Sequence, residues 1–160
     1  MGAAPPTVSV VNGPNLGELG TRQPEHYGDV SQPELIDMMK ARASGLGLEL
    51  AFFQSDIEGE IVRAINEASG SSVGLVINPA GYSHYSVAIM DAMLAFQGPV
   101  VEVHITPVLA RESFRRELVT AAAADAFISG AGVEGYLHAL EMVLEIRNRK
   151  DGGSISANQQ

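Results

Sequence analysis

The chain has 160 residues, of which 46% are apolar, and this is enough to bury the core of one domain. It contains no cysteine, which excludes disulfides, thiolate catalysis and cysteine-ligated metals. A formal charge of −9 argues against nucleic acid or membrane partners, and the sequence shows neither a leader peptide nor a membrane-length apolar run, so we expect a cytoplasmic protein.

The first predicted strand, residues 8–12, leads into an unusually long connection, residues 13–30. Strand-to-helix loops usually have ~2 to 6 residues, so we interpret this segment as a functional lid. The first helix is expected to begin at Ser31, where Ser31 and Glu34 fit a capping box, and to end near Gly45.

Four further strands are expected, each followed by a helix. A helix that begins near Ile57 is predicted from apolar residues at steps of three and four, namely Ile57, Ile61, Ala64, Ile65 and Ala68. The other predicted strands are residues 48–54, 73–78, 100–105 and 126–129, and the other predicted helices are residues 83–96, 111–120 and 133–149.

This alternation of strands and helices predicts a parallel sheet covered on both faces. Five such units in about 150 residues favour a flavodoxin-like, doubly wound α/β sheet of five strands over an eight-stranded barrel, which needs ~250 residues. We expect a single domain over residues 1–150 and a disordered tail over residues 151–160.

The carboxyl ends of parallel strands meet at one edge of the sheet, and ligands bind there in open α/β folds. The residues at the predicted ends are Asn12, Gln54, Asn78, His104 and Gly130, and the loops beyond them contain Tyr27, His84 and Arg115. We interpret this edge as a polar, proton-handling site.

Two patterns at this edge indicate acid–base chemistry. Tyr27 can serve as a base at neutral pH only if a nearby cation favours its phenolate, and Arg22 is the candidate cation. Glu102 and His104 share one side of an apolar strand, where burial is costly unless they hydrogen bond or reach a cavity. We expect Glu102 to orient the imidazole, and Arg115 to bind a carboxylate bidentately.

Four arginines, Arg22, Arg111, Arg115 and Arg116, fall in the two segments that flank this edge. A local cationic pocket on an acidic protein predicts a small anionic ligand. Taken singly, Arg111 and Arg116 are expected at the surface.

Three stretches resemble the motifs of the type II 3-dehydroquinate dehydratases, in the order and spacing of that family. They are NGPNLGELGTRQPEHYG at 12–28, NPAGYSHYSVAIMDA at 78–92, and VEVHI at 101–105 followed by ARESFR at 110–115, with a weaker match in GAGVEGY at 130–136. The resemblance spans residue 8 to about residue 144. It implies a trans elimination of water from 3-dehydroquinate, without metal or cofactor, that gives 3-dehydroshikimate through an enolate.

The resemblance also implies roles for individual residues. Tyr27 takes the proton next to the ketone, Arg22 keeps Tyr27 ionised, and His104 protonates the departing hydroxyl. Asn15 positions the water that stabilises the enolate, while Glu102 orients His104. The groups implied in substrate binding are Asn78, His84, Arg115 and the backbone amides of Ile105 and Thr106.

Assembly is implied in the same way. Asp91 reaches the site of a neighbouring subunit in this family, which implies trimers assembled into a dodecamer. Some positions depart from the family pattern, with Thr106 in place of serine, Pro107 of asparagine and Leu109 of histidine, and an alanine-rich segment at 117–126. Whether these departures alter activity stays open, as does the choice between the shikimate pathway and quinate breakdown.

The alternative is a flavin- or nucleotide-binding flavodoxin-like module, which would need a glycine- and hydroxyl-rich first loop. A phospho-receiver would need an acidic residue in place of Asn78. A metal hydrolase lacks a third ligand beside His84 and His104. A lysine imine is disfavoured because Lys40 and Lys150 are not at a strand end.

Overall fold

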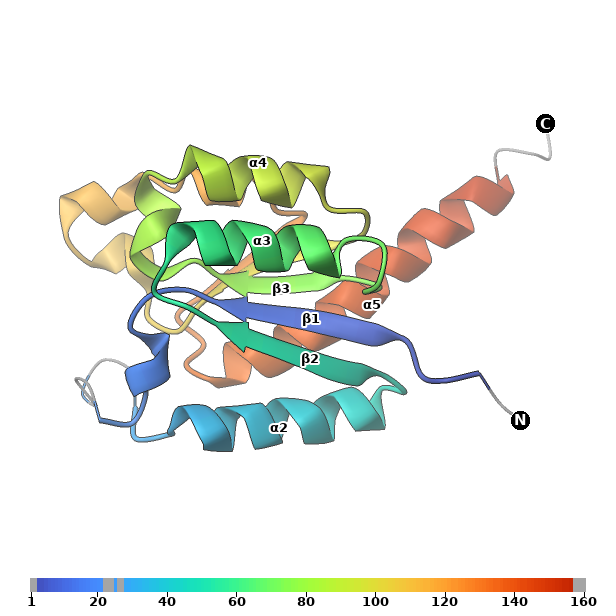
Figure 1. Ribbon diagram of the computed structural model, residues 1–160, viewed down its shortest axis with the longest axis horizontal. Helices are drawn as coiled ribbons and strands as arrows, with labels where there is room; N and C mark the ends of the chain where they lie inside the picture. Colours follow the sequence, from blue (N-terminus) through green and yellow to red (C-terminus); the bar gives the residue numbers. More distant parts are fainter. Residues whose placement is uncertain (1–2, 22–24, 26–27, 157–160) are drawn as a thin grey trace.

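The computed structural model describes residues 3–21, 25 and 28–156. Five parallel strands form one sheet in the order β2-β1-β3-β4-β5. Figure 1 labels three of these neighbours, β2, β1 and β3. The strands are β1 (Thr7–Asn12), β2 (Glu49–Gln54), β3 (Leu75–Asn78), β4 (Val100–His104) and β5 (Ala126–Ser129). The four α-helices of the described part are α2 (Gln32–Gly45), α3 (Glu58–Ala68), α4 (Val87–Ala95) and α5 (Glu134–Ser156). The predicted flavodoxin-like sheet is confirmed.

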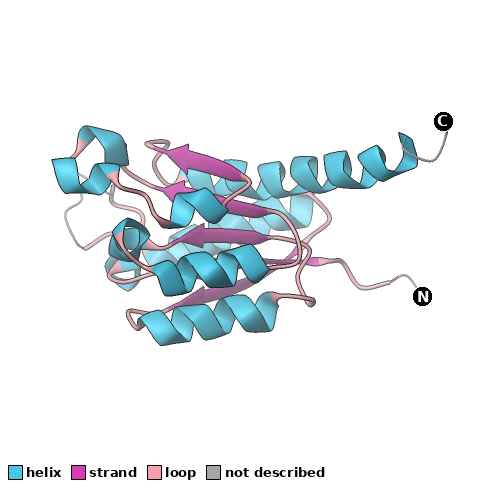
Figure 2. Ribbon diagram, turned by 90° about the horizontal axis from the view of Figure 1, so that it is seen from above, coloured by secondary structure: helices cyan, strands magenta, loops and turns pink. Residues whose placement is uncertain are grey.

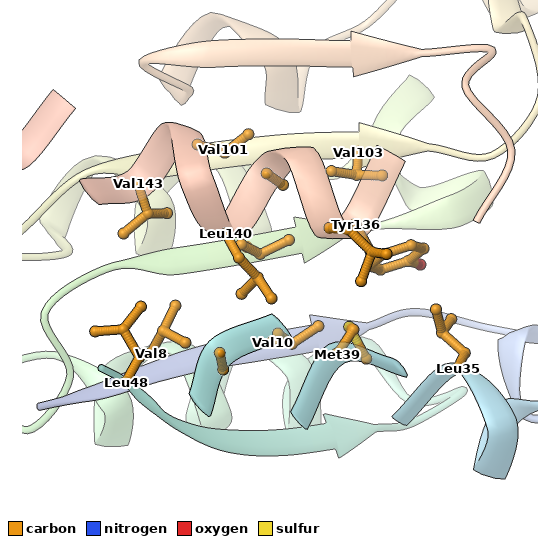
Figure 3. Close-up of a cluster of buried hydrophobic side chains, with 14 of the residues drawn as sticks. Val8, Val10, Leu35, Met39, Leu48, Val101, Val103, Tyr136, Leu140 and Val143 are labelled. Carbon is orange, nitrogen blue, oxygen red and sulfur yellow. The ribbon is translucent and has the colours of Figure 1, made fainter. Parts of the chain in front are cut away.

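Helices cover both faces of the sheet, with α3 and α4 on one face and α2 and α5 on the other (Figure 1). Alternate residues of β1 serve the two sides, since Val8 and Val10 join the cluster with α2 and α5 (Figure 3), while Val11 joins the cluster with α3 and α4. Strands buried on both faces therefore consist of nearly continuous apolar runs, as the sequence predicted.

The start of α2 follows from its capping box. The Ser31 hydroxyl accepts a hydrogen bond from the backbone N–H of Glu34, and the Glu34 carboxylate accepts one at 2.8 Å from the backbone N–H of Ser31. This predicted start is confirmed. The predicted inward face of α3 is wrong at one position, because Ile57 is the residue before the helix and is 59% exposed.

Two other predicted helices differ from the structure. α4 begins at Val87, because the Ser86 hydroxyl caps it by accepting from the N–H of Ile89, and Ser83 and His84 belong to the preceding 3-10 helix η2 (Ala80–His84). The helix predicted at 111–120 is absent from these residues, all of which are described. Short 3-10 helices occupy this region, namely η3 (Val108–Ala110), η4 (Ser113–Arg116) and η5 (Thr120–Ala123).

Residues 111–120 do not form the predicted helix because the segment lacks an apolar face that packs on the rest of the protein. Phe114, the one aromatic residue of the segment, is 62% exposed. A short helix in water is marginal unless one face packs against the rest of the protein.

At the carboxyl end, α5 runs beyond the sheet to Ser156 (Figure 2), so residues 151–156 of the expected disordered tail are helical.

Candidate active site

A cavity of about 130 Å³ opens at the carboxyl edge of the sheet. It is lined by the segments that follow β1, β3 and β4, so the topology that places these strand ends side by side also creates the site. Of the predicted site residues, the cavity gathers Asn15, Asn78, His84, His104, Ile105, Thr106 and Arg115.

The last residue of β4, His104, is paired with a buried carboxylate behind it. The Nε2 atom of His104 lies 2.7 Å from Oε1 of Glu102, and the two side chains are 7% and 0% exposed. The His104 ring also packs against the ring of Phe127 in β5, with centroids 5.4 Å apart. Because Nε2 is engaged by Glu102, the nitrogen of His104 available to a ligand in the cavity is Nδ1.

The backbone that follows His104 is held by the connection between β5 and α5. The carbonyl of His104 accepts from the N–H of Gly130 at 3.1 Å, and the carbonyl of Ile105 accepts from the N–H of Gly132 at 3.0 Å. In a planar trans peptide the N–H points away from the carbonyl. The N–H groups of Ile105 and Thr106 are therefore turned away from this connection.

The side chain of Ser129 adds two further contacts to this loop, and residues 129–132, which hold the loop, are called the clamp below. Its hydroxyl donates to the carbonyl of Thr106 and accepts from the N–H of Val108, both at 3.1 Å. Gly130 has φ +87°, and a side chain there would come within 3.1 Å of Pro107, so glycine allows the two segments to meet. Pro107 thus packs in the clamp, and the loop after β4 is fixed at each of its carbonyls from His104 to Thr106.

Two arginines, Arg111 and Arg115, line the cavity, with side chains 21% and 24% exposed. Their Nε atoms lie 3.5 Å and 2.8 Å from one oxygen of Glu112. A hydrogen bond from the Glu112 N–H, together with the one from Arg115, lowers the pKa of the Glu112 carboxyl. Arg111 lines the cavity, as the clustering of arginines predicted, whereas Arg116 is exposed.

Asn15 enters the cavity through the close approach of two loops. A side chain at Gly13 would lie 2.5 Å from the carbonyl oxygen of Pro79, so only glycine lets the β1 and β3 loops meet. Asn15 itself has φ 66°, and its N–H donates to the carboxylate of Asp56 at 2.8 Å. Asp56 was not anticipated, since it lies in the sequence far from the residues that it positions.

His84, which lines the cavity, also has a partner outside it. Nδ1 of His84 lies 2.8 Å from the carbonyl oxygen of Glu117, which ties the β3 loop to the segment after η4. Asp91 is exposed on α4 and does not line the cavity of its own chain. Arg22 and Tyr27 lie outside the described residues.

Two charged residues of the cavity, Glu18 and Arg111, were not among the predicted site residues, although Arg111 belongs to the arginines expected to flank this edge. The clustering of Arg111 with Arg115 in one segment was the signal that pointed to it. Glu18 lies in η1 (Leu16–Glu18), one turn after Asn15. Across the described residues, no group of three carboxylate or imidazole side chains is arranged to hold a metal ion, and none of the described helices has the length and apolarity of a membrane span.

Fold and cavity together define a doubly wound α/β protein whose cavity holds a buried carboxylate–histidine pair and two arginines. The model of the family described as dehydroquinase class II matches residues 6–144. The chain belongs to this class II dehydroquinase family, whose curated members matched here are named 3-dehydroquinate dehydratases and are hydro-lyases.

The similarity extends over most of the chain. A 3-dehydroquinate dehydratase from Bartonella henselae is 47% identical over 142 residues, which are 89% of this chain and 96% of the relative. Among solved structures, the type II dehydroquinase from Propionibacterium acnes is 39% identical with a TM-score of 0.82, and covers 85% of this chain and 94% of its own. That from Butyrivibrio crossotus is 37% identical with a TM-score of 0.86, and covers 89% and 99%.

Proposed function

We propose that this chain removes water from 3-dehydroquinate to give 3-dehydroshikimate, by a trans elimination through an enolate. The observation that carries the proposal is the buried Glu102–His104 pair facing a cavity lined by two arginines. It supplies a proton donor of fixed orientation next to cations that attract an anionic substrate. Family membership supports this reaction over the alternative of a flavin- or nucleotide-binding module.

In this proposal the substrate carboxylate binds at the turned amides of Ile105 and Thr106, with Arg115 at its side. The clamp from Ser129 to Gly132 supports this role, because it keeps the carbonyls of the loop from facing the anion. Asn78 and His84 contact the ring hydroxyls. Thr106 keeps the hydroxyl that a serine would provide at this position.

The proton transfers are assigned to two groups. Tyr27, as a phenolate stabilised by Arg22, takes the proton from the carbon next to the ketone, and Asn15 positions the water that stabilises the enolate oxygen. His104 then donates the proton on Nδ1 to the departing hydroxyl, which leaves as water, while its Nε2 remains hydrogen bonded to Glu102. The roles of Tyr27 and Arg22 stay predictions, because both lie outside the described residues.

The assembly is also proposed, as trimers built into a dodecamer in which Asp91 of one subunit reaches the site of its neighbour. The exposure of Asp91 on α4 supports this, as does the exposure of the nearby apolar side chains Tyr85, Val87 and Leu94, at 64%, 55% and 62%. Mixing Asp91→Ala with His104→Ala protein tests it. Restored activity in the mixture supports shared sites, whereas two inactive proteins that stay inactive after subunit exchange would contradict them.

The reaction is tested by adding 3-dehydroquinate and recording the ultraviolet absorbance of the conjugated product. We expect wild-type protein to form product without added metal, and Tyr27→Phe and His104→Ala to be nearly inactive. Arg116→Ala, at an exposed position, is the control and should keep wild-type rates. No product from folded wild-type protein would refute the proposed function, and full activity of Tyr27→Phe would refute the proposed base.

The cellular role is proposed as a cytoplasmic step of either the shikimate pathway or quinate breakdown. Expression in a strain that lacks 3-dehydroquinate dehydratase tests the activity in a cell, and induction by quinate tests which of the two roles applies. Growth without aromatic amino acids indicates that the enzyme can serve biosynthesis. Induction of the native protein by quinate indicates the catabolic role.

A further inference from the structure

A fully buried tyrosine at the start of α5, Tyr136, joins the ends of two strands beside the cavity. Its hydroxyl accepts a hydrogen bond from Nδ2 of Asn78 at 3.0 Å and donates one to Oδ1 of Asn12 at 2.9 Å. Tyr136 and Asn12 are 0% exposed, and Asn78 is 3% exposed. The ring packs in the apolar cluster between the sheet and α5, near Val103 and Leu140 (Figure 3). The hydroxyl oxygen is therefore the one part of this side chain that makes polar contacts.

The direction of these hydrogen bonds is fixed by a backbone group. The N–H of Ala80 donates to Oδ1 of Asn78 at 3.1 Å, and a backbone N–H can only donate. The Asn78 amide must therefore present Nδ2 to Tyr136. Burial raises the pKa of Tyr136 far above its usual value, so the hydroxyl keeps its proton, and that proton must point to Asn12.

This network is only partly satisfied within the described residues. Nδ2 of Asn12 is buried and has no hydrogen-bond partner among the described residues. Burying an amide group without a partner costs free energy, and an incompletely satisfied network is a poor substitute for an apolar core. A phenylalanine at position 136 would fill the same apolar cluster but would leave Nδ2 of Asn78 and Oδ1 of Asn12 without this partner. The hydroxyl therefore serves two amides, and one of them, Asn78, lines the cavity.

We propose that Tyr136 is a positioning residue that sets the amide of Asn78 for substrate. With Oδ1 held by Ala80 and one Nδ2 proton held by Tyr136, the second Nδ2 proton of Asn78 is left for the cavity that Asn78 lines. Asn78 thereby acts as a donor to an oxygen of the substrate ring. The inference rests on the proposed dehydratase function and adds Tyr136, and Asn12 behind it, to the residues on which substrate binding depends.

Steady-state kinetics of Tyr136→Phe with 3-dehydroquinate test this inference. We expect KM to rise about tenfold, the change that loss of one well-placed hydrogen bond produces, while kcat changes less than about threefold. The matched control is Ser9→Ala, which removes the buried Ser9–Ser72 hydrogen bond of 2.7 Å, in the part of β1 away from the cavity. It should lower Tm and leave KM unchanged.

A double-mutant cycle with Asn78→Ala separates positioning from general packing. If Tyr136 acts through Asn78, Tyr136→Phe has little further effect on KM in the Asn78→Ala background. Additive effects, or an unchanged KM in the single variant of an active enzyme, overturn the inference. Inactive folded wild-type protein instead refutes the proposed function.

A second measurement needs no variant. In ¹⁵N-labelled wild-type protein, the two side-chain amide protons of Asn78 should exchange with water at different rates, the proton held by Tyr136 more slowly. Equal exchange of the two protons would also overturn the inference, whether or not Tyr136→Phe folds.

Discussion

Replacing Glu102 by glutamine keeps the shape of a fully buried side chain and removes its charge. In the wild type the carboxylate lies 2.7 Å from Nε2 of His104 and fixes the ring that faces the cavity. Hydrogen bonds to charged groups contribute ~1.5 to 3 kcal/mol. If Glu102 acts on the proton transfer by His104, kcat should fall about 10- to 100-fold, since each ~1.4 kcal/mol of barrier is a factor of ten.

Stability should respond differently from activity. The second carboxylate oxygen of Glu102 is buried without a hydrogen-bond partner in the described part of the chain, so the wild type already bears a desolvation cost there. In Glu102→Gln the side-chain Nε2 takes the place of this unpartnered oxygen, so the number of buried polar atoms without a partner is unchanged. We therefore expect Tm to change by only a few degrees. The account therefore predicts a folded protein with a large loss of kcat.

The assay is product absorbance in the steady state, with Tm measured on the same samples. Glu58→Gln is the matched control, because Glu58 is a half-buried carboxylate that accepts a hydrogen bond from the Ser86 hydroxyl between α3 and α4. It should leave kcat unchanged. A Glu102→Gln protein with wild-type kcat would refute the role given to the pair.

Three further predictions follow from the contacts. Ser129→Ala releases the carbonyl of Thr106, and we expect KM to rise about tenfold at similar Tm; an unchanged KM would show that the clamp does not shape the anion site. Gly13→Ala places a carbon 2.5 Å from Pro79 and should cost ~1 to 3 kcal/mol of unfolding free energy in denaturant titrations, whereas Gly59→Ala, in an open helical position, should not destabilise. Burial raises the pKa of Asp125, but hydrogen bonds from Lys150 and from the N–H of Val100 outweigh it and lower the pKa below 3.8, so this carboxylate stabilises the fold above about pH 4 and the contribution is lost on acidification. Tm measured against pH should fall less steeply below pH 4 for Asp125→Asn than for the wild type, and parallel curves would contradict this.

Local patterns in the sequence were sufficient to predict most of the fold. The capping box at Ser31 and the apolar runs of the strands depend on neighbouring residues alone, so they could be recognised without coordinates. The helix expected at 111–120 was wrong because charge and helix propensity do not replace an apolar face. The start of α4 was missed because Ser86 competes with earlier residues as the cap.

The sequence predicted contacts within the site only where the interacting residues lie close together in the chain. Glu102 and His104 are two residues apart on one strand, so their contact follows from the alternation of side chains along it. The contacts of Tyr136 with Asn78 and of Ser129 with Thr106 join residues far apart in the chain. They depend on how closely elements far apart in the chain pack, and no spacing in the sequence encodes that distance.

In the proposed trans elimination, acid and base act on opposite faces of the substrate ring, with His104 at the face from which the hydroxyl departs. The most direct test uses 3-dehydroquinate carrying deuterium in one orientation on the carbon next to the ketone, with the product analysed by NMR. The account predicts loss of the hydrogen trans to the departing hydroxyl and retention of the other. Loss of the cis hydrogen would contradict it.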